Sequence, residues 1–118
     1  MKIEETRKII SGTVYDIEGA EMIGWGSNMS YEYEPSLDEI IYHVQSVGNL
    51  VVERLYQAKN GKYFVYGMGG NCSEYAEQYV TGMGAGSDIW SIDEEDIASW
   101  AERYNLVDVY LKFKQSSK

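Results

Sequence analysis

Two aromatic-rich runs joined by Asn60-Gly61 constrain the fold of this chain most strongly. The stretch LYQAKNGKYFVYGMGGN, residues 55–71, lies on both sides of that dipeptide. Asn-Gly tolerates the positive φ angles that a tight hairpin turn requires. Side chains alternate between two faces on both sides of the turn. Before it, one face carries Val52, Arg54 and Tyr56 and the other carries Val51, Glu53 and Leu55. After it, one face carries Tyr63, Val65 and Gly67 and the other carries Phe64, Tyr66 and Met68. The pattern predicts an antiparallel β-hairpin.

The glycines after this hairpin do not match a nucleotide-binding loop. A phosphate loop needs Gly-x-x-x-x-Gly-Lys-Ser/Thr, and neither GMGGN nor GMGAG supplies the lysine. We expect the glycines to let the chain reverse sharply or pack closely against a second copy of the chain. The region GNCSEYAEQYVTGMGAGSDI, residues 70–89, is predicted to be a mobile loop with a helical turn at Ser73–Tyr79.

A helix is predicted from Leu37 to Val47. Ser36 and Glu39 form a capping box, in which each side chain satisfies a free backbone N–H of the other residue. Gly48 is a natural C-terminal stop. The apolar residues fall at helical spacing on one face: Leu37, Ile40, Ile41, Val44 and Val47.

A second helix is predicted over Ile92–Tyr104, because Ser91 and Glu94 have the spacing of another capping box. Its buried face consists of Ile97, Trp100, Ala101 and Tyr104. The segment 106–113 fits two patterns. Val107, Val109, Leu111 and Phe113 alternate as in a strand, whereas Leu106, Val109, Tyr110 and Phe113 fit a helix. Residues 114–118 are expected to form a frayed tail.

The N-terminal part is predicted to be another hairpin, in which Arg7–Asp16 pairs with Ala20–Asn28. The element order then predicts a single α+β domain over residues 1–118. Its four-stranded antiparallel sheet consists of the two hairpins, and the helices Leu37–Val47 and Ile92–Tyr104 cover one face.

The chain of 118 residues carries a net charge of −9, which repels nucleic acid at long range. This charge fits solubility, a basic protein partner or mimicry of nucleic acid towards a protein that binds it, and plain solubility is the favoured interpretation. One cysteine and one histidine cannot make a zinc site. No long apolar run is present, so we expect a cytoplasmic protein without a membrane segment. Glycine-rich strands, many aromatic residues and small size favour a homodimer or a larger ring.

Asp16, Glu18 and Glu21 lie close together around the first predicted turn and are one alternative catalytic site. Clustered carboxylates can hold Mg²⁺, and a bound metal can activate water for phosphodiester cleavage. A solvated acidic turn explains the same residues without any ligand, and this interpretation is favoured. We therefore predict no cofactor, with Mg²⁺ as the alternative.

Arg54, Tyr56, Lys62 and Phe64 are the residues on which a single-stranded nucleic acid platform would depend. Solubilising charges on an exposed hairpin are the more frequent explanation of such a pattern, so we expect weak nucleic acid binding or none. His43 and Cys72 would make a catalytic pair only if the fold brought them together. A structural role for His43 is the favoured interpretation.

Three stretches carry a family resemblance: IISGTVYDIEGAEMIGWGSN, LYQAKNGKYFVYGMGGNCSEYA and DIWSIDEEDIASWAERY. In this order they resemble small accessory proteins of Firmicutes phages and mobile elements. Those proteins share the patterns Y-D-x-x-x-A, G-x-[YF]-F-x-Y-G-x-G-G and W-A-E. The resemblance extends to the sheet of PC4-type single-strand DNA-binding proteins. The helix 37–47 is an insertion relative to the family pattern.

The resemblance implies a non-enzymatic interaction protein of a phage or mobile element. Such a protein acts on a host protein or on nucleic-acid machinery, as anti-defence factors do. The alternatives are a metal-dependent DNA nicking enzyme and a PC4-like single-stranded DNA-binding protein.

Overall fold

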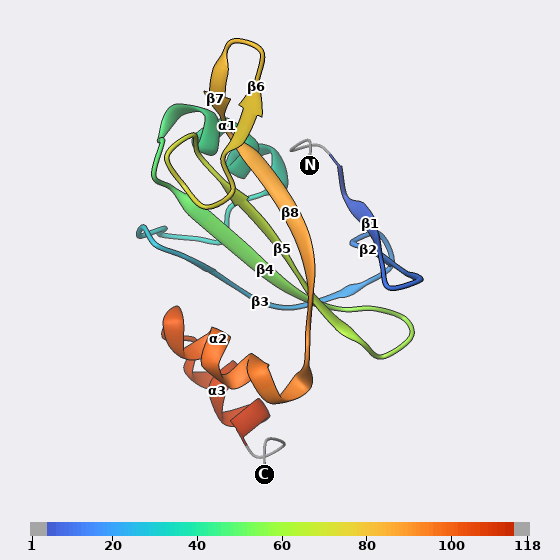
Figure 1. Cartoon of the computed structure of the whole chain (residues 1–118). Helices are drawn as coiled ribbons and strands as arrows, with labels where there is room; N and C mark the ends of the chain where they lie inside the picture. Colours follow the sequence, from blue (N-terminus) through green and yellow to red (C-terminus); the bar gives the residue numbers. More distant parts are fainter. Residues whose placement is uncertain (1–4, 115–118) are drawn as a thin grey trace.

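The computed structural model describes residues 5–114 of the chain, and the predicted tail lies outside this range except for Lys114. Eight strands and three α-helices occur in the described part (Figure 1). In chain order they are β1 (Arg7–Ile10), β2 (Thr13–Asp16), β3 (Glu21–Ser27), α1 (Leu37–Ser46), β4 (Val51–Gln57), β5 (Tyr63–Gly69), β6 (Glu77–Tyr79), β7 (Gly82–Gly84), β8 (Gly86–Ile92), the 3-10 helix η1 (Glu94–Asp96), α2 (Ile97–Arg103) and α3 (Val107–Lys114).

The predicted α+β class and the four-stranded antiparallel sheet are confirmed. The sheet has the strand order β3-β4-β5-β8. Strands β4 and β5 form the predicted hairpin, from Gln57 paired with Tyr63 to Val51 paired with Gly69. Its turn is longer than a two-residue turn, because the N–H of Ala58 still donates to the carbonyl of Lys62 and only Gly61 has a positive φ, +85°.

The predicted first hairpin was wrong in its pairing. The segment 7–16 folds back on itself as β1 and β2, with Ile10 paired to Thr13. Ser11 and Gly12 form the turn with φ values of 50° and 80°, the two positive angles of a type I′ turn. Strand β3 is thereby left to pair with β4 in the main sheet.

The fourth strand of the sheet, β8, comes from a region that we expected to be a loop. The helical turn predicted at Ser73–Tyr79 was also wrong, because Glu77–Tyr79 is strand β6, which pairs with β7. In Figure 1 the β6–β7 hairpin extends from the start of β8, and the β1–β2 hairpin lies beside that strand. Lys8 Nζ and Asp88 Oδ1, 2.7 Å apart, link β1 to β8.

The two predicted capping boxes behave differently. The box at Ser36 is confirmed: the N–H of Glu39 donates to Ser36 Oγ at 3.2 Å, and the N–H of Ser36 donates to Glu39 Oε1 at 3.0 Å. The box at Ser91 does not form, because Ser91 lies within β8. Asp93 is the N-cap of η1 instead, without a side-chain bond to the helix backbone.

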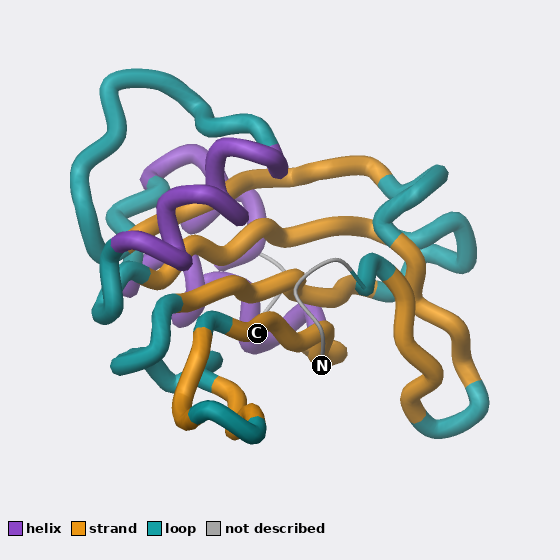
Figure 2. Tube along the Cα trace, turned by 90° about the horizontal axis from the view of Figure 1, so that it is seen from above, coloured by secondary structure: helices purple, strands orange, loops and turns teal. Residues whose placement is uncertain are grey.

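The helices lie on opposite faces of the sheet, and not on one face as predicted (Figures 1 and 2). Helix α1 covers a first cluster, which contains Ile40, Val44, Val52, Tyr56, Phe64, Tyr66, Met68 and Ile89. Helices α2 and α3 cover a second cluster, which contains Leu55, Val65, Ile92, Ile97, Trp100, Ala101 and Phe113. Residues 107–114 are therefore a helix, and Leu106, Val109 and Tyr110 pack against this second cluster.

Candidate binding pocket

Four residues form one row across the whole sheet: Gly26, Glu53, Gly67 and Asp88, from β3, β4, β5 and β8. The row lies on the face that α2 covers, because Glu53 alternates with Val52, which packs on the α1 side. Glu53 is only 1% exposed and stands between the two glycines. A buried carboxylate is costly unless donors surround it, so its surroundings decide what this face can do.

The two glycines leave room for two tyrosine rings. The ring of Tyr104 packs on Gly26, and the ring of Tyr75 packs on Gly67, so closely that a Cβ at either glycine would overlap the ring atoms. Each ring is directed along the row, so that its hydroxyl group reaches Glu53. The glycines therefore explain how two large side chains lie flat on the sheet beside a carboxylate.

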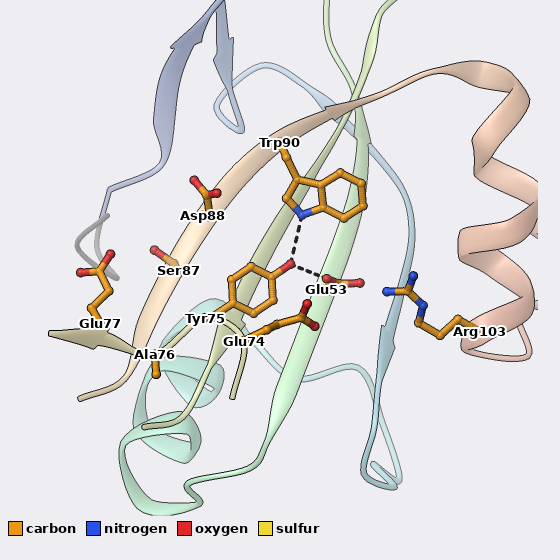
Figure 3. Close-up of a pocket in the computed structure, with 9 residues that line it drawn as sticks. All are labelled: Glu53, Glu74, Tyr75, Ala76, Glu77, Ser87, Asp88, Trp90 and Arg103. Carbon is orange, nitrogen blue, oxygen red and sulfur yellow. Dashed lines mark hydrogen bonds between the residues drawn. The ribbon is translucent and has the colours of Figure 1, made fainter. Parts of the chain in front are cut away.

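The carboxylate of Glu53 accepts three hydrogen bonds. Its Oε1 atom accepts from Trp100 Nε1 at 2.9 Å and from the Tyr104 hydroxyl at 2.7 Å. Its Oε2 atom accepts from the Tyr75 hydroxyl, which in turn accepts from Trp90 Nε1 at 3.0 Å (Figure 3). The network ties β4 to α2, to β8 and to the loop before β6.

Both phenols keep their protons in this network. Burial, together with the nearby Glu53 carboxylate, raises the pKa of Tyr75 far above its usual value. Burial and the hydrogen bond to Glu53 raise the pKa of Tyr104 in the same direction. Both hydroxyl groups therefore act as donors, and the side-chain oxygens of Glu53 accept from them and from the indole N–H of Trp100.

A pocket of about 550 Å³ opens beside the network. This volume is within the range of about 300–1,000 Å³ that ligand sites occupy. Figure 3 shows the carboxylates of Glu53 and Glu74 on one side of the Tyr75 ring and those of Glu77 and Asp88 on the other. The remaining lining residues are Ala76, Ser87, Trp90 and Arg103.

A second pocket of about 370 Å³ shares Trp90 and Arg103 with the first one. Its lining includes Asp93 and Asp96 from the start of the C-terminal helices. We call the two pockets together the acidic groove. It is lined by six carboxylates, and among the described residues Arg103 is its one basic lining residue.

The alternative metal site does not come together. Asp16 Oδ1 accepts from the backbone N–H of Glu18 at 2.9 Å, which is the arrangement of a turn. Glu21 is exposed at the start of β3. Within residues 5–114, the acidic side chains close enough to share a cation are a different group, Asp93, Glu95 and Asp96, whose ligand atoms lie within 4.8 Å of one another. The nicking alternative therefore stays a prediction without a geometric basis.

The predicted nucleic acid platform is wrong for its two aromatic residues, because Tyr56 and Phe64 are buried and do not form an exposed surface. Tyr56 is 5% exposed and Phe64 is fully buried; their rings stack on each other at 5.3 Å, and the Tyr15 ring packs against Phe64 at 5.4 Å. Arg54 donates to the carbonyl of Pro35 and to the Tyr56 hydroxyl. Lys62 is exposed in the hairpin turn. Rings inside the core cannot stack on bases, because both of their faces already contact protein.

His43 and Cys72 each have a different neighbour. His43 Nδ1 and the Tyr31 hydroxyl share a hydrogen bond of 3.0 Å, which agrees with a structural role for the histidine. The exposed thiol of Cys72 donates to Asn71 Oδ1 at 3.3 Å.

Sequence reasoning missed Glu53 as the centre of the site. It placed Glu53 on one face with Val51 and Leu55 but gave that face no function. The useful signal was a charged residue between two apolar residues of one strand face, together with glycines in the two neighbouring strands. The partners Tyr75, Trp100 and Tyr104 are 22, 47 and 51 residues away, so no local pattern connects them to Glu53.

No helix in the described part of the chain is long and apolar enough to cross a membrane. Comparison with family models, with curated proteins and with solved structures returns no match for this chain. The functional argument therefore depends on the acidic groove and on the network that holds its walls.

Proposed function

We propose that this chain is a non-enzymatic binding protein that engages a basic protein partner through the acidic groove. In the setting that the sequence resemblance implies, the partner is a host protein, and the chain is an accessory protein of a phage or mobile element with an anti-defence role. The observation that carries the proposal is the placement of six carboxylates in two adjoining pockets with Arg103 as the one basic lining residue described.

The position of the groove supports this proposal. Its residues come from β4, from the loop before β6 and the start of β6, from β8, which is an edge strand of the main sheet, and from η1 and α2 with the residue before them. The network around Glu53 fixes Tyr75, so the groove is already formed before a partner arrives, which reduces the entropy cost of binding.

The net charge of the whole chain also favours a basic partner. At −9 it attracts a basic surface at long range and raises the rate of encounter, and this attraction weakens as salt rises. The groove then supplies the close contacts that the long-range field cannot specify.

Capture from a host lysate tests the proposal. The immobilised chain is compared with Glu74→Lys, which reverses one exposed charge in the groove, and with Glu18→Lys, which makes the same change at an exposed residue between β2 and β3 that lines neither pocket. Captured proteins are identified by mass spectrometry, purified and measured by calorimetry at low and high salt. We expect a basic protein that binds wild type and Glu18→Lys equally, binds Glu74→Lys at least about tenfold more weakly, and loses affinity with salt.

Two results would overturn the proposal. One is that every captured protein binds Glu74→Lys as tightly as wild type. The other is that no captured protein depends on salt or carries a basic surface.

A further inference from the structure

We propose that the larger pocket of the acidic groove receives the guanidinium group of an arginine side chain from the partner protein. This inference rests on the proposed function, because it names the chemical group by which a basic partner is recognised. The pocket of about 550 Å³ combines a buried carboxylate, an exposed carboxylate and two aromatic rings, and each of them suits a planar cation.

The floor of the pocket offers an acceptor that the protein leaves partly unused. Glu53 Oε1 accepts two hydrogen bonds, from Trp100 and Tyr104, whereas Oε2 accepts one, from Tyr75. A carboxylate oxygen can accept two, so Oε2 has room for one further donor. Glu53 lines the pocket and is 1% exposed, so a donor that reaches it meets little competition from bulk water.

The wall beside Glu53 adds a second carboxylate. Glu74 is exposed and lines the same pocket as Glu53, and Figure 3 shows both carboxylates on the same side of the Tyr75 ring. On the other side of the Tyr75 ring, Asp88 is already engaged by Lys8 at 2.7 Å. An incoming cation therefore gains the most electrostatic attraction at the pair Glu53 and Glu74.

The aromatic rings favour a guanidinium group over an ammonium group. Tyr75 and Trp90 both line the pocket and are joined by a hydrogen bond of 3.0 Å, which fixes their relative orientation. A guanidinium group is planar, stacks on aromatic faces and presents several N–H donors in a rigid fork. A guanidinium group can donate to Glu53 and Glu74 at the same time. An ammonium group is a strongly hydrated point charge, so it loses more hydration free energy on entering the pocket.

Arg103 is the internal competitor for the same position. Figure 3 shows its guanidinium group directed towards Glu53, but no ion pair within 4.0 Å joins the two residues in the described structure. Arg103 is exposed and lies at the end of α2. Because it is a like charge at the pocket, its removal should strengthen the binding of an incoming arginine.

Nuclear magnetic resonance of the labelled full chain tests the inference. The indole N–H signal of Trp90 reports on the pocket, and that of Trp25, which packs in the cluster under α1, is an internal control. The probes are N-acetyl-arginine methylamide, its lysine counterpart and its neutral citrulline counterpart. We expect the arginine probe to shift the Trp90 signal saturably, with no comparable shift from lysine or citrulline. A silent Trp90 signal, or equal shifts from all three probes, would overturn the inference.

Variants locate the effect. Glu74→Gln should weaken the arginine probe about tenfold, which corresponds to the loss of one hydrogen bond between charged groups. Glu18→Gln, the matched control, should leave its affinity unchanged, and Arg103→Gln should increase it. An unchanged affinity in Glu74→Gln contradicts the assigned position.

The two proposals fail in distinguishable ways. If a basic protein is captured through the groove while the arginine probe leaves Trp90 unaffected, the inference fails and the proposed function stands. If the probe binds as expected but no captured protein depends on Glu74, the proposed function fails instead.

Discussion

The two faces of the sheet are stabilised in different ways. On the face under α1, Tyr56, Phe64 and Tyr66 pack in an aromatic and aliphatic cluster. On the face under α2, the cluster is interrupted by Glu53, whose carboxylate accepts three hydrogen bonds. The first face depends mainly on shape and apolar area, and the second depends also on matched donors and acceptors. The larger pocket of the groove opens beside this network, on the second face.

The largest effect is expected on the apolar face. Phe64→Ala should lower the free energy of unfolding by about 3–5 kcal/mol, because a fully buried ring is removed and a cavity remains. Urea denaturation measures the change. Val80→Ala, at an exposed hairpin tip, is the control and should change the free energy by less than about 0.5 kcal/mol. A loss below about 1 kcal/mol for Phe64→Ala would show that this face is loosely packed.

A smaller effect is expected from Glu53→Gln, which changes the chemistry of the second face at nearly constant volume. The amide group turns one acceptor into a donor, so one of Tyr75, Trp100 and Tyr104 loses its partner, at a cost of about 1–3 kcal/mol. The same denaturation assay measures it, with Glu102→Gln on the exposed side of α2 as the control. A stability equal to that of wild type would mean that the network is replaceable.

High pH should weaken the second face. The pKa values of Tyr75 and Tyr104 are raised in the folded state, so above pH 10 the unfolded chain releases these protons first and stability falls as pH rises. Tyr75 alone should remove about 1.4 kcal/mol by pH 11, and the more exposed Tyr104 should remove less. Well below pH 10 this contribution is fully present. The urea midpoint at pH 9, 10 and 11 measures the effect, and a Tyr75→Phe variant should show a shallower decline.

The smallest effect separates the two capping sequences. Ser36→Ala should cost about 1 kcal/mol, because the N–H of Glu39 loses its acceptor at the start of α1. Ser91→Ala should change stability by less than about 0.5 kcal/mol, because Ser91 is an exposed strand residue. Equal costs at both sites would contradict the conclusion that Ser36 caps a helix and Ser91 does not.

Local patterns predicted the elements whose signals are contained within one segment. The helix at Leu37 and the hairpin at Asn60-Gly61 both have a start, a periodic face and a stop within about twenty residues. Strand β8 lacks such a signal, because Gly86, Ser87 and Asp88 interrupt the β-forming residues and the chain pairs them only through β5. The capping spacing at Ser91 was misleading for the same reason, since strand pairing there outweighs a local helix signal.

The candidate site was less predictable than the fold. The residues of the larger pocket come from β4, β6, β8, α2 and the loop before β6, and the pattern in each segment has an ordinary explanation. Only the strand register, which places Glu53 between Gly26 and Gly67, shows why this acidic residue matters to the site. The predicted residues Tyr56 and Phe64 had the right composition for a stacking surface, but α1 covers their face.

The separation in sequence between Glu53 and its donors has a consequence for folding kinetics. The network closes only when the loop at Tyr75 and helix α2 with its C-cap Tyr104 dock, and these contacts span 22 to 51 residues. We expect contacts of this kind to form after the local β4–β5 hairpin, because the chain must first lose the entropy of closing the long loops between the contacting residues. Substitutions in the network should therefore accelerate unfolding and leave the folding rate nearly unchanged, so the lifetime of the folded protein depends on this one row of the sheet.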